Sequence, residues 1–285
     1  MLTRENKVEI IGTLESINVI KDTSPKTGAY LRGNLVVKVS SPKTMNIPLN
    51  FFTSAQTKDG KPRKLYGQLD SLRQGQRISI TGSIEDNKFW DQSRGQLVKG
   101  KRLNVVFVNN VGSSDGDKAE FSYSGFVKET LKENFNSEGV ATGYSIKLAQ
   151  SNYDGSRCQV IGFMVDPKNT AAVRYITQEY TSGKTVKVSG ELDYDIITET
   201  REQAVDFGKP ITKTFQRNIS NLIITSGVSV SEGVYEREDI DKLVAGDAAD
   251  DRQVESGAHA QEKSGAQVST NKPLASSSST NQSLL

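Results

Sequence analysis

The chain has 285 residues and a formal net charge of +2, from 36 lysines and arginines against 34 aspartates and glutamates. Hydrophobic residues make up 35%, which is low for a fully packed chain, so we expect part of it to be unfolded. The only cysteine is Cys158, and the only histidine, His259, lies in a polar stretch, which excludes an intramolecular disulfide, a His/Cys zinc site and a Ser–His–Asp triad in a core. With no long apolar run and no apolar signal segment, the chain is expected to be a cytoplasmic binding protein without a cofactor.

Alternating apolar and polar residues predict β-strands over most of the first 230 residues. In chain order the first copy of the pattern predicts a bent strand over 8–19, a turn-rich loop over 21–28, strands over 31–39 and 45–52, a short helix over 65–72, a strand over 77–84, a loop over 85–100 and a strand over 103–108.

The same order recurs in the second part of the chain. It predicts strands over 121–130, 143–148 and 158–165, a helix with Pro167 in its first turn, a strand over 183–192, a long charged loop and a last strand over 219–225. Residues 75–84 align without gaps on residues 183–192, including both glycines, which indicates duplication.

Three strands, a helix and two strands is the order of an OB-fold, a five-stranded partly open barrel. Gly12 and Gly125, in the two first strands, suit the bends of a small barrel. We therefore predict an all-β chain of two tandem five-stranded OB-fold barrels, at 1–112 and 118–228, each with one short helix between strands 3 and 4. A β-sandwich is the main alternative, although the recurring helix argues against it.

The remaining residues, 232–285, are acidic and then serine-rich, and we expect a disordered tail. Within it, Ile240, Leu243 and Val244 indicate a short helix that ends at Gly246. Net charge falls from +9 over the first 112 residues to −5 over the last 55, which is typical of a polyanion-binding protein with a regulatory tail, or of ordinary solvated surfaces.

Single-stranded nucleic acid requires cations for its phosphates and aromatic rings on which its bases stack. OB-folds present them on strands 2 and 3 and on the loops joining strands 1–2 and 4–5. The candidates in the first barrel are Lys21, Lys26, Tyr30, Arg32, Lys38, Phe52, Lys88, Phe89, Trp90, Arg94, Lys99 and Lys101. Those in the second barrel are Tyr144, Lys147, Lys209, Lys213, Phe215 and Arg217. Acidic residues in the last loop of the second barrel predict weaker binding there or a contact with protein, and Trp90 is expected either to stack on a base or to pack on the barrel.

Through the paired G-x-x-I/V-x-I/V-x-G-x-I/L strands, the basic aromatic loops and the acidic C-terminal region, the chain resembles single-stranded DNA-binding proteins of the phage or bacterial type. The resemblance spans roughly residues 5–226. It implies a protein, oligomeric in many relatives, that covers and protects single strands during DNA replication, recombination or repair in a bacterial or phage-infected cytoplasm, without a sequence preference. It also implies recruitment of replication or recombination proteins through the tail. The chain departs from the family by having two barrels and by carrying its acidic stretch, 232–251, well before the C-terminus.

Two other functions fit the same pattern: a protein-interaction or virion structural module built on OB barrels, and single-stranded RNA binding. An enzyme is not predicted. Asp193 and Asp195 alternate in a charged strand end, which is typical of a solvated edge, and no phosphate-binding glycine motif adjoins them.

Overall fold

The computed structural model describes residues 4–25, 28–41, 43–91, 95–112, 114–136, 138–152, 154–203 and 211–265, with the backbone alone described over 196–203, 211–218 and 257–265. The strands are β1 (Asn6–Ser24), β2 (Gly28–Val39), β3 (Met45–Ser54), β4 (Arg77–Asp91), β5 (Gln96–Asn110), β6 (Lys118–Phe135), β7 (Ala141–Ser151), β8 (Cys158–Val165), β9 (Thr185–Gln203) and β10 (Ile211–Ser229). The helices are α1 (Lys64–Ser71), α2 (Thr170–Glu179) and α3 (Arg237–Gly265).

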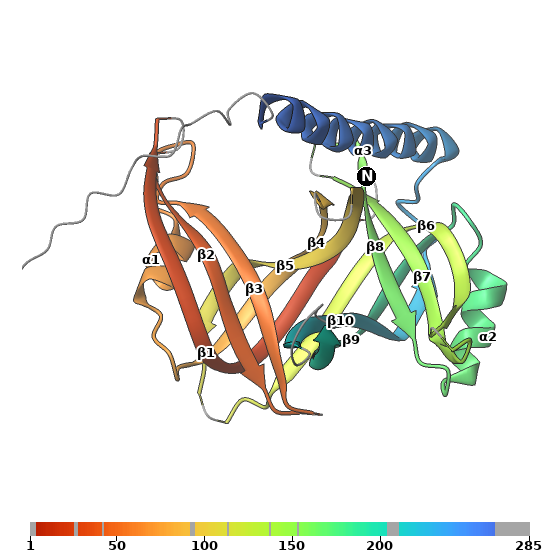
Figure 1. The fold of residues 1–285 in the computed structure, drawn as a ribbon, viewed down its shortest axis with the longest axis horizontal. Coiled ribbons are helices and arrows are strands. Elements are labelled where there is room, and N and C mark those ends of the chain that lie inside the picture. The colour runs from red at the N-terminus through yellow and green to blue at the C-terminus, as the bar shows by residue number, and fades with distance from the viewer. Residues whose placement is uncertain are drawn as a thin grey trace, which may run out of the picture.

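The strands of each half pair by the same scheme. In the first half β1 pairs with β2 and β4, β2 with β3, and β4 with β5, while one parallel pair, Asn50 with Asn104, joins β3 to β5. In the second half β6 pairs with β7 and β9, β7 with β8, and β9 with β10, and Ile223 with Met164 is the corresponding parallel pair. Antiparallel pairing of β1 with β6 joins the halves, which lie side by side (Figure 1). The prediction of a mostly β chain is confirmed.

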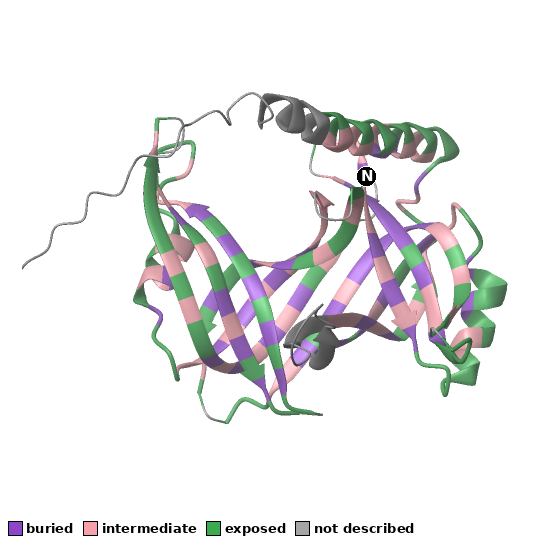
Figure 2. Ribbon diagram, viewed as in Figure 1, coloured by how far each residue is buried: buried purple, intermediate pink, exposed green. Residues whose placement is uncertain are grey.

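Buried and exposed residues alternate along the strands (Figure 2). In β3, Leu49 and Phe51 are buried, whereas Asn50 and Phe52, which alternate with them, are exposed. Successive side chains of a strand point to opposite faces, which produces this alternation. Most buried apolar residues of both halves form one cluster. The opposite faces of the strands are thus left for binding.

Glycines occupy the positions at which another strand passes closely. A Cβ atom at Gly12 would meet the carbonyl oxygen of Lys38, and one at Gly125 would meet that of Ala149. The equivalent close approach in the two halves explains why both first strands carry glycine at this position.

The two short helices lie on the outer flanks of the halves (Figure 1). Helix α1 occupies the predicted place. Helix α2 begins at Thr170, where the side chain of Asn169 accepts a hydrogen bond from the backbone N–H of Ala172 (3.1 Å). The prediction that Pro167 lies in its first turn was wrong, because the capping asparagine starts the helix two residues after that proline.

The long loop predicted over residues 85–100 is instead an extended hairpin. Strands β4 and β5 remain in register from the pair Glu85–Arg102 to the pair Asp91–Gln96. Strand β1 also continues to Ser24, so most of the predicted loop over 21–28 is strand. These extensions carry polar residues on both faces, so a prediction based on the alternation of apolar and polar residues did not detect them.

The acidic region forms helix α3, which lies along the top of the view (Figure 1). The predictions of disorder over 237–265 and of a helix end at Gly246 were therefore wrong, while residues 266–285 lie outside the described residues. A Cβ atom at Gly246 would meet the backbone oxygen of Ser156, so glycine here lets the helix approach the second half closely. Among the described residues no helix has the length and apolar character needed to span a membrane.

Candidate nucleic-acid interface

A groove of about 770 Å³ crosses the outward face of the first half. Its lining comes from β1, β2, β3, β4 and β5, so residues up to 88 positions apart in sequence meet in it. The lining residues are Asn18, Ile20, Arg32, Gly33, Asn34, Asn50, Phe51, Phe52, Ser83, Glu85, Arg102, Asn104, Val105 and Val106.

An aromatic pair includes one exposed ring of the groove, that of Phe52, and the half-buried ring of Tyr30 that packs against it. The rings of Tyr30 and Phe52 lie 5.3 Å apart, and the side chain of Phe52 is 61% exposed. The hydroxyl of Tyr30 donates a hydrogen bond to Asp22 (2.8 Å), which raises the pKa of the tyrosine and holds its ring in place. An exposed ring supported from one side is suited to stack on a flat apolar group.

The guanidinium group of Arg32 accompanies these rings. Arg32 pairs in register with Phe52 across β2 and β3, so the two side chains share the outward face. Arg32 forms no ion pair among the described residues, and it is exposed. A second arginine, Arg102, is 3.0 Å from Glu85 in the same groove. Among the described residues, the groove therefore offers the unpaired cation of Arg32 beside the ring of Phe52, which Tyr30 supports.

A row of asparagines forms the middle of the groove. Asn18 is opposite Asn34, Asn34 is opposite Asn50, and Asn50 is opposite Asn104, across four neighbouring strands. Side chains at opposite positions of paired strands point to one face, so the four amides face the groove together.

The α3-facing side of the β4–β5 hairpin carries several of the predicted cations. Lys88, only 7% exposed, is 2.5 Å from Asp247, 2.8 Å from Asp251 and 3.2 Å from Asp250. Burial alone would lower the pKa of Lys88, but the hydrogen bonds that its ammonium group donates to these carboxylates, and their negative charges, outweigh burial and raise the pKa. Lys99 is 2.5 Å from Asp251. These two lysines are thus neutralised by α3.

Two more predicted residues share this side of the hairpin. Trp90 is opposite Leu97, and Lys101 is opposite Asp86, with their side chains on the same face as Lys88. Burial lowers the pKa of Lys101 to about 8. Phe89 points the other way, toward the groove side of the hairpin, and is 47% exposed.

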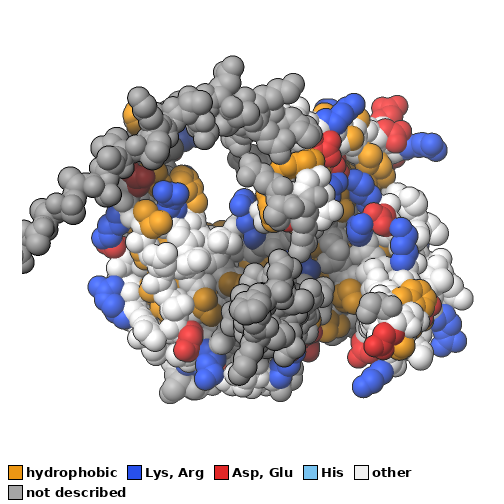
Figure 3. All heavy atoms as spheres, in the orientation of Figure 1, with side chains coloured by type: hydrophobic (Ala, Val, Ile, Leu, Met, Phe, Trp, Pro, Cys, Tyr) orange, Lys and Arg blue, Asp and Glu red, His pale blue; other side chains and the backbone are white. Residues whose placement is uncertain are grey.

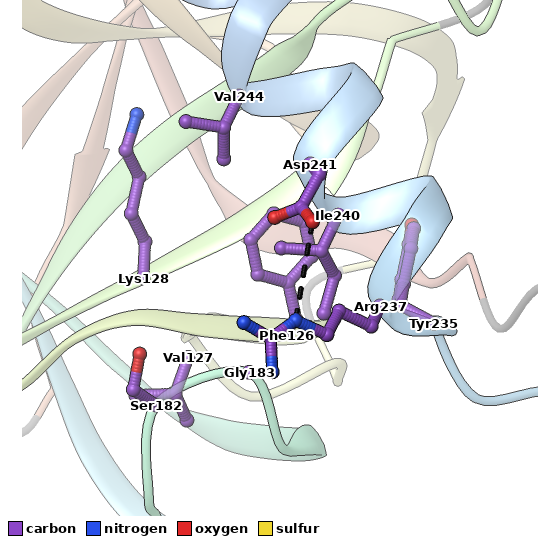
Figure 4. A pocket seen from close by; sticks show the side chains of 10 residues that line it. All are labelled: Phe126, Val127, Lys128, Ser182, Gly183, Tyr235, Arg237, Ile240, Asp241 and Val244. Atoms are coloured by element: carbon purple, nitrogen blue, oxygen red, sulfur yellow. Dashed lines mark ion pairs between the residues drawn. The ribbon is translucent and has the colours of Figure 1, made fainter.

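Helix α3 docks on the second half through apolar side chains. Leu243 and Tyr235 pack with Phe126, Ala149 and Cys158 in a small buried cluster. A pocket of about 620 Å³ remains beside this contact, with Ile240 above Phe126 and the ion pair between Arg237 and Asp241 at its edge (Figure 4). Acidic and basic side chains lie together where the described part of the helix meets the rest of the molecule (Figure 3). The helix is held by both apolar burial and charge.

The other predicted residues lie elsewhere. Lys21 is opposite the buried Leu31, and its ammonium group pairs with Asp70 of α1 (2.6 Å), so it points away from the face of Arg32. Lys38 is exposed on that face but does not line the groove. In the second half Tyr144 is half-buried, and Lys147 is 2.8 Å from Glu129.

Six of the predicted residues cannot be placed. Lys26, Arg94 and Lys209 lie outside the described residues, as do the side chains of Lys213, Phe215 and Arg217. Of the residues predicted for the first half, Arg32 and Phe52 line one groove and Tyr30 packs against Phe52, while Lys88, Lys99 and Lys101 lie on the α3 side of the hairpin.

A family model described as YorF matches residues 4–257, which include both halves and most of α3. The chain belongs to the YorF family. A search of curated proteins found no match. Among solved structures, the YorF chain is similar to the single-stranded DNA-binding protein of Thermus aquaticus, at 15% identity and a TM-score of 0.51 over 82% of this chain and 96% of that one. A deletion variant of the Thermus protein is similar at 15% identity and a TM-score of 0.50, over 82% of this chain and 98% of that one. The likeness shows a common fold that extends over both halves.

Sequence reasoning missed half of the groove in this YorF chain. Alternation placed Asn34 on the outward face and Asn50 on the same side as Phe52, but nothing local indicated that Asn18 and Asn104 stand in the same row. Arg102 directly follows Lys101 in the sequence, and only the register of the β4–β5 hairpin shows that Arg102, and not Lys101, faces the groove.

Proposed function

We propose that the protein binds single-stranded DNA through the groove of its first half, with little dependence on sequence overall. The observation that carries this proposal is the exposed ring of Phe52, which Tyr30 supports, beside the exposed Arg32. Stacking on rings and charge pairing with phosphates are the two contributions that binding to a single strand requires.

The fold supports the same proposal. We infer that each half is an OB-fold, over residues 1–112 and 118–228, because each pairs its five strands in the same cycle with one single-residue parallel contact. A partly open five-stranded barrel is an architecture that commonly binds oligonucleotides. The similar Thermus protein is described as a single-stranded DNA-binding protein.

The biological setting that fits this activity is DNA replication, recombination or repair in a bacterial or phage-infected cytoplasm, in which the protein covers exposed strands. No chemical step is part of this proposal. Residues beyond α3 are proposed to contact partner proteins, and RNA binding is the competing possibility. Competition between DNA and RNA oligomers of equal sequence separates the two nucleic acids, because they differ at the 2′-hydroxyl.

The deciding experiment replaces Phe52 by alanine and measures binding to fluorescently labelled oligo-dT. Loss of a stacked base should weaken binding by about 1–3 kcal/mol. Phe107→Ala is the matched control, because Phe107 is 55% exposed but does not line the groove. With about four to six neutralised phosphates, log affinity should fall with log salt at a slope of about −3 to −4. Equal affinities of the two variants, or a preference for duplex DNA, would contradict the proposal.

A further inference from the structure

The asparagine row has an unusual supply of unused hydrogen-bonding groups. Paired strands lie about 4.8 Å apart, so the row of Asn18, Asn34, Asn50 and Asn104 extends over roughly 14 Å. Each amide carries an acceptor oxygen beside a donor N–H₂ group. Among the described residues, none of these four side chains has a hydrogen-bond partner in the protein. Their hydrogen-bonding capacity is available to a ligand.

The second half uses its corresponding groups internally. There the single parallel pair is Met164 with Ile223, and Ser145 is opposite Met164. The hydroxyl of Ser145 donates to the amide oxygen of Asn134 (2.9 Å), and the amide nitrogen of Asn134 contacts the sulfur of Met164 (3.8 Å). Of the two rows, only that of the first half presents a series of free amides.

We infer that the asparagine row of the first half binds the hydrogen-bonding edge of a nucleobase. A side-by-side donor and acceptor is complementary to base edges, which expose the same pair of groups, as N3–H and O4 do in thymine. Phe52 is two residues beyond Asn50 along β3, so a base on the row has a stacking ring beside it. The inference rests on the proposed function and adds to it one position at which the edge of a base is read.

Stacking and phosphate contacts do not depend on the edge of a base, which makes the inference testable. The probe is an oligomer of N3-methylthymidine, which keeps the ring and the phosphates of oligo-dT but loses the N3–H donor. The wild-type chain should bind oligo-dT at least about fivefold more tightly than the methylated oligomer, because methylation removes at least one contact with the edge of a base.

The variants assign this preference to the row. In Asn34→Ala/Asn50→Ala the ratio of the two affinities should fall to about one, whereas Asn46→Ala should keep the wild-type ratio, because Asn46 is exposed on the same strand outside the groove. The single variant Asn50→Ser, which retains a smaller polar side chain, should reduce the ratio in part and serves if the double variant does not fold.

The outcomes separate this inference from the function on which it rests. Equal binding of both oligomers by the wild-type chain, or an equal ratio in the double variant and in Asn46→Ala, overturns the role of the row and leaves single-stranded DNA binding intact. Binding of neither oligomer overturns the proposed function itself.

Discussion

Carboxylates of α3 form ion pairs with lysines that could otherwise contact phosphates. Removal of these carboxylates is therefore expected to strengthen DNA binding. The variant Asp250→Asn/Asp251→Asn removes the partner of Lys99, which lies 2.5 Å from Asp251. It leaves Lys88 paired with Asp247 at 2.5 Å, so the buried lysine keeps a counter-charge and the helix keeps its anchor. The perturbation therefore frees at least one cation without undocking α3.

The size of the effect follows from counterion release. Each phosphate contact on a single strand contributes about −0.7 to the slope of log affinity against log salt. One freed lysine should therefore tighten binding about eightfold at about 50 mM monovalent salt and less than about twofold at about 0.5 M. The slope itself should become steeper by about 0.7.

The assay is fluorescence anisotropy of labelled oligo-dT at several salt concentrations. Asp239→Asn/Asp241→Asn is the matched control, since it removes the same charge from α3, and among the described residues the one ion pair of these two aspartates is that of Asp241 with Arg237 of the helix itself. Thiol labelling of Cys158, which is buried beneath α3, confirms that the helix stays docked in both variants. If the two variants tighten binding equally, the direct contacts of Asp250 and Asp251 do not restrict binding and the reasoning is refuted.

Two further predictions concern stability. The pKa of Lys101 in the folded protein is about 8, below the unfolded value of about 10.4, so the folded state carries an unfavourable buried charge below pH 8 that diminishes as the pH rises toward 10.4. Lys101→Met should therefore raise the free energy of unfolding by about 2–3 kcal/mol at pH 7 but not near pH 10.5, as measured by urea denaturation, and an equal gain at both values would contradict the assignment. Leu243→Ala removes a buried side chain from the contact of α3 and should cost about 2–4 kcal/mol of docking. Labelling of the Cys158 thiol should then accelerate by about 30-fold or more, and an unchanged rate would show that the helix is held by its ion pairs alone.

The faces of individual strands could be predicted from the order of residues alone. Alternation placed Leu49 and Phe51 inside and Asn50 and Phe52 outside, because the direction of a side chain depends only on its parity along a strand. The glycine positions were also informative, since Gly12 and Gly125 lie where a side chain would collide with a neighbouring backbone. Such properties are local, or depend on a repeated pattern, and a sequence contains them directly.

The assembly of the groove depended on register, which no local pattern specifies. Asn18 and Asn104 are 86 positions apart and share a row only because two intervening strands, β2 and β3, pair in one particular alignment. A shift of one residue in any of these pairings would turn the amides of that strand to the other face. Tertiary structure therefore decided which polar residues form the site.

Helix α3 shows the same limit in a different way. Its apolar residues Ile240, Leu243 and Val244 are too few to stabilise a helix in isolation, which is why its composition predicted disorder. In the folded chain they bury against the second half, and Asp247 joins Lys88 of one half to Lys128 of the other, at 2.5 and 2.6 Å. The surface that orders this helix exists only after the two halves have folded side by side, so its structure was decided by packing and charge pairing between distant segments.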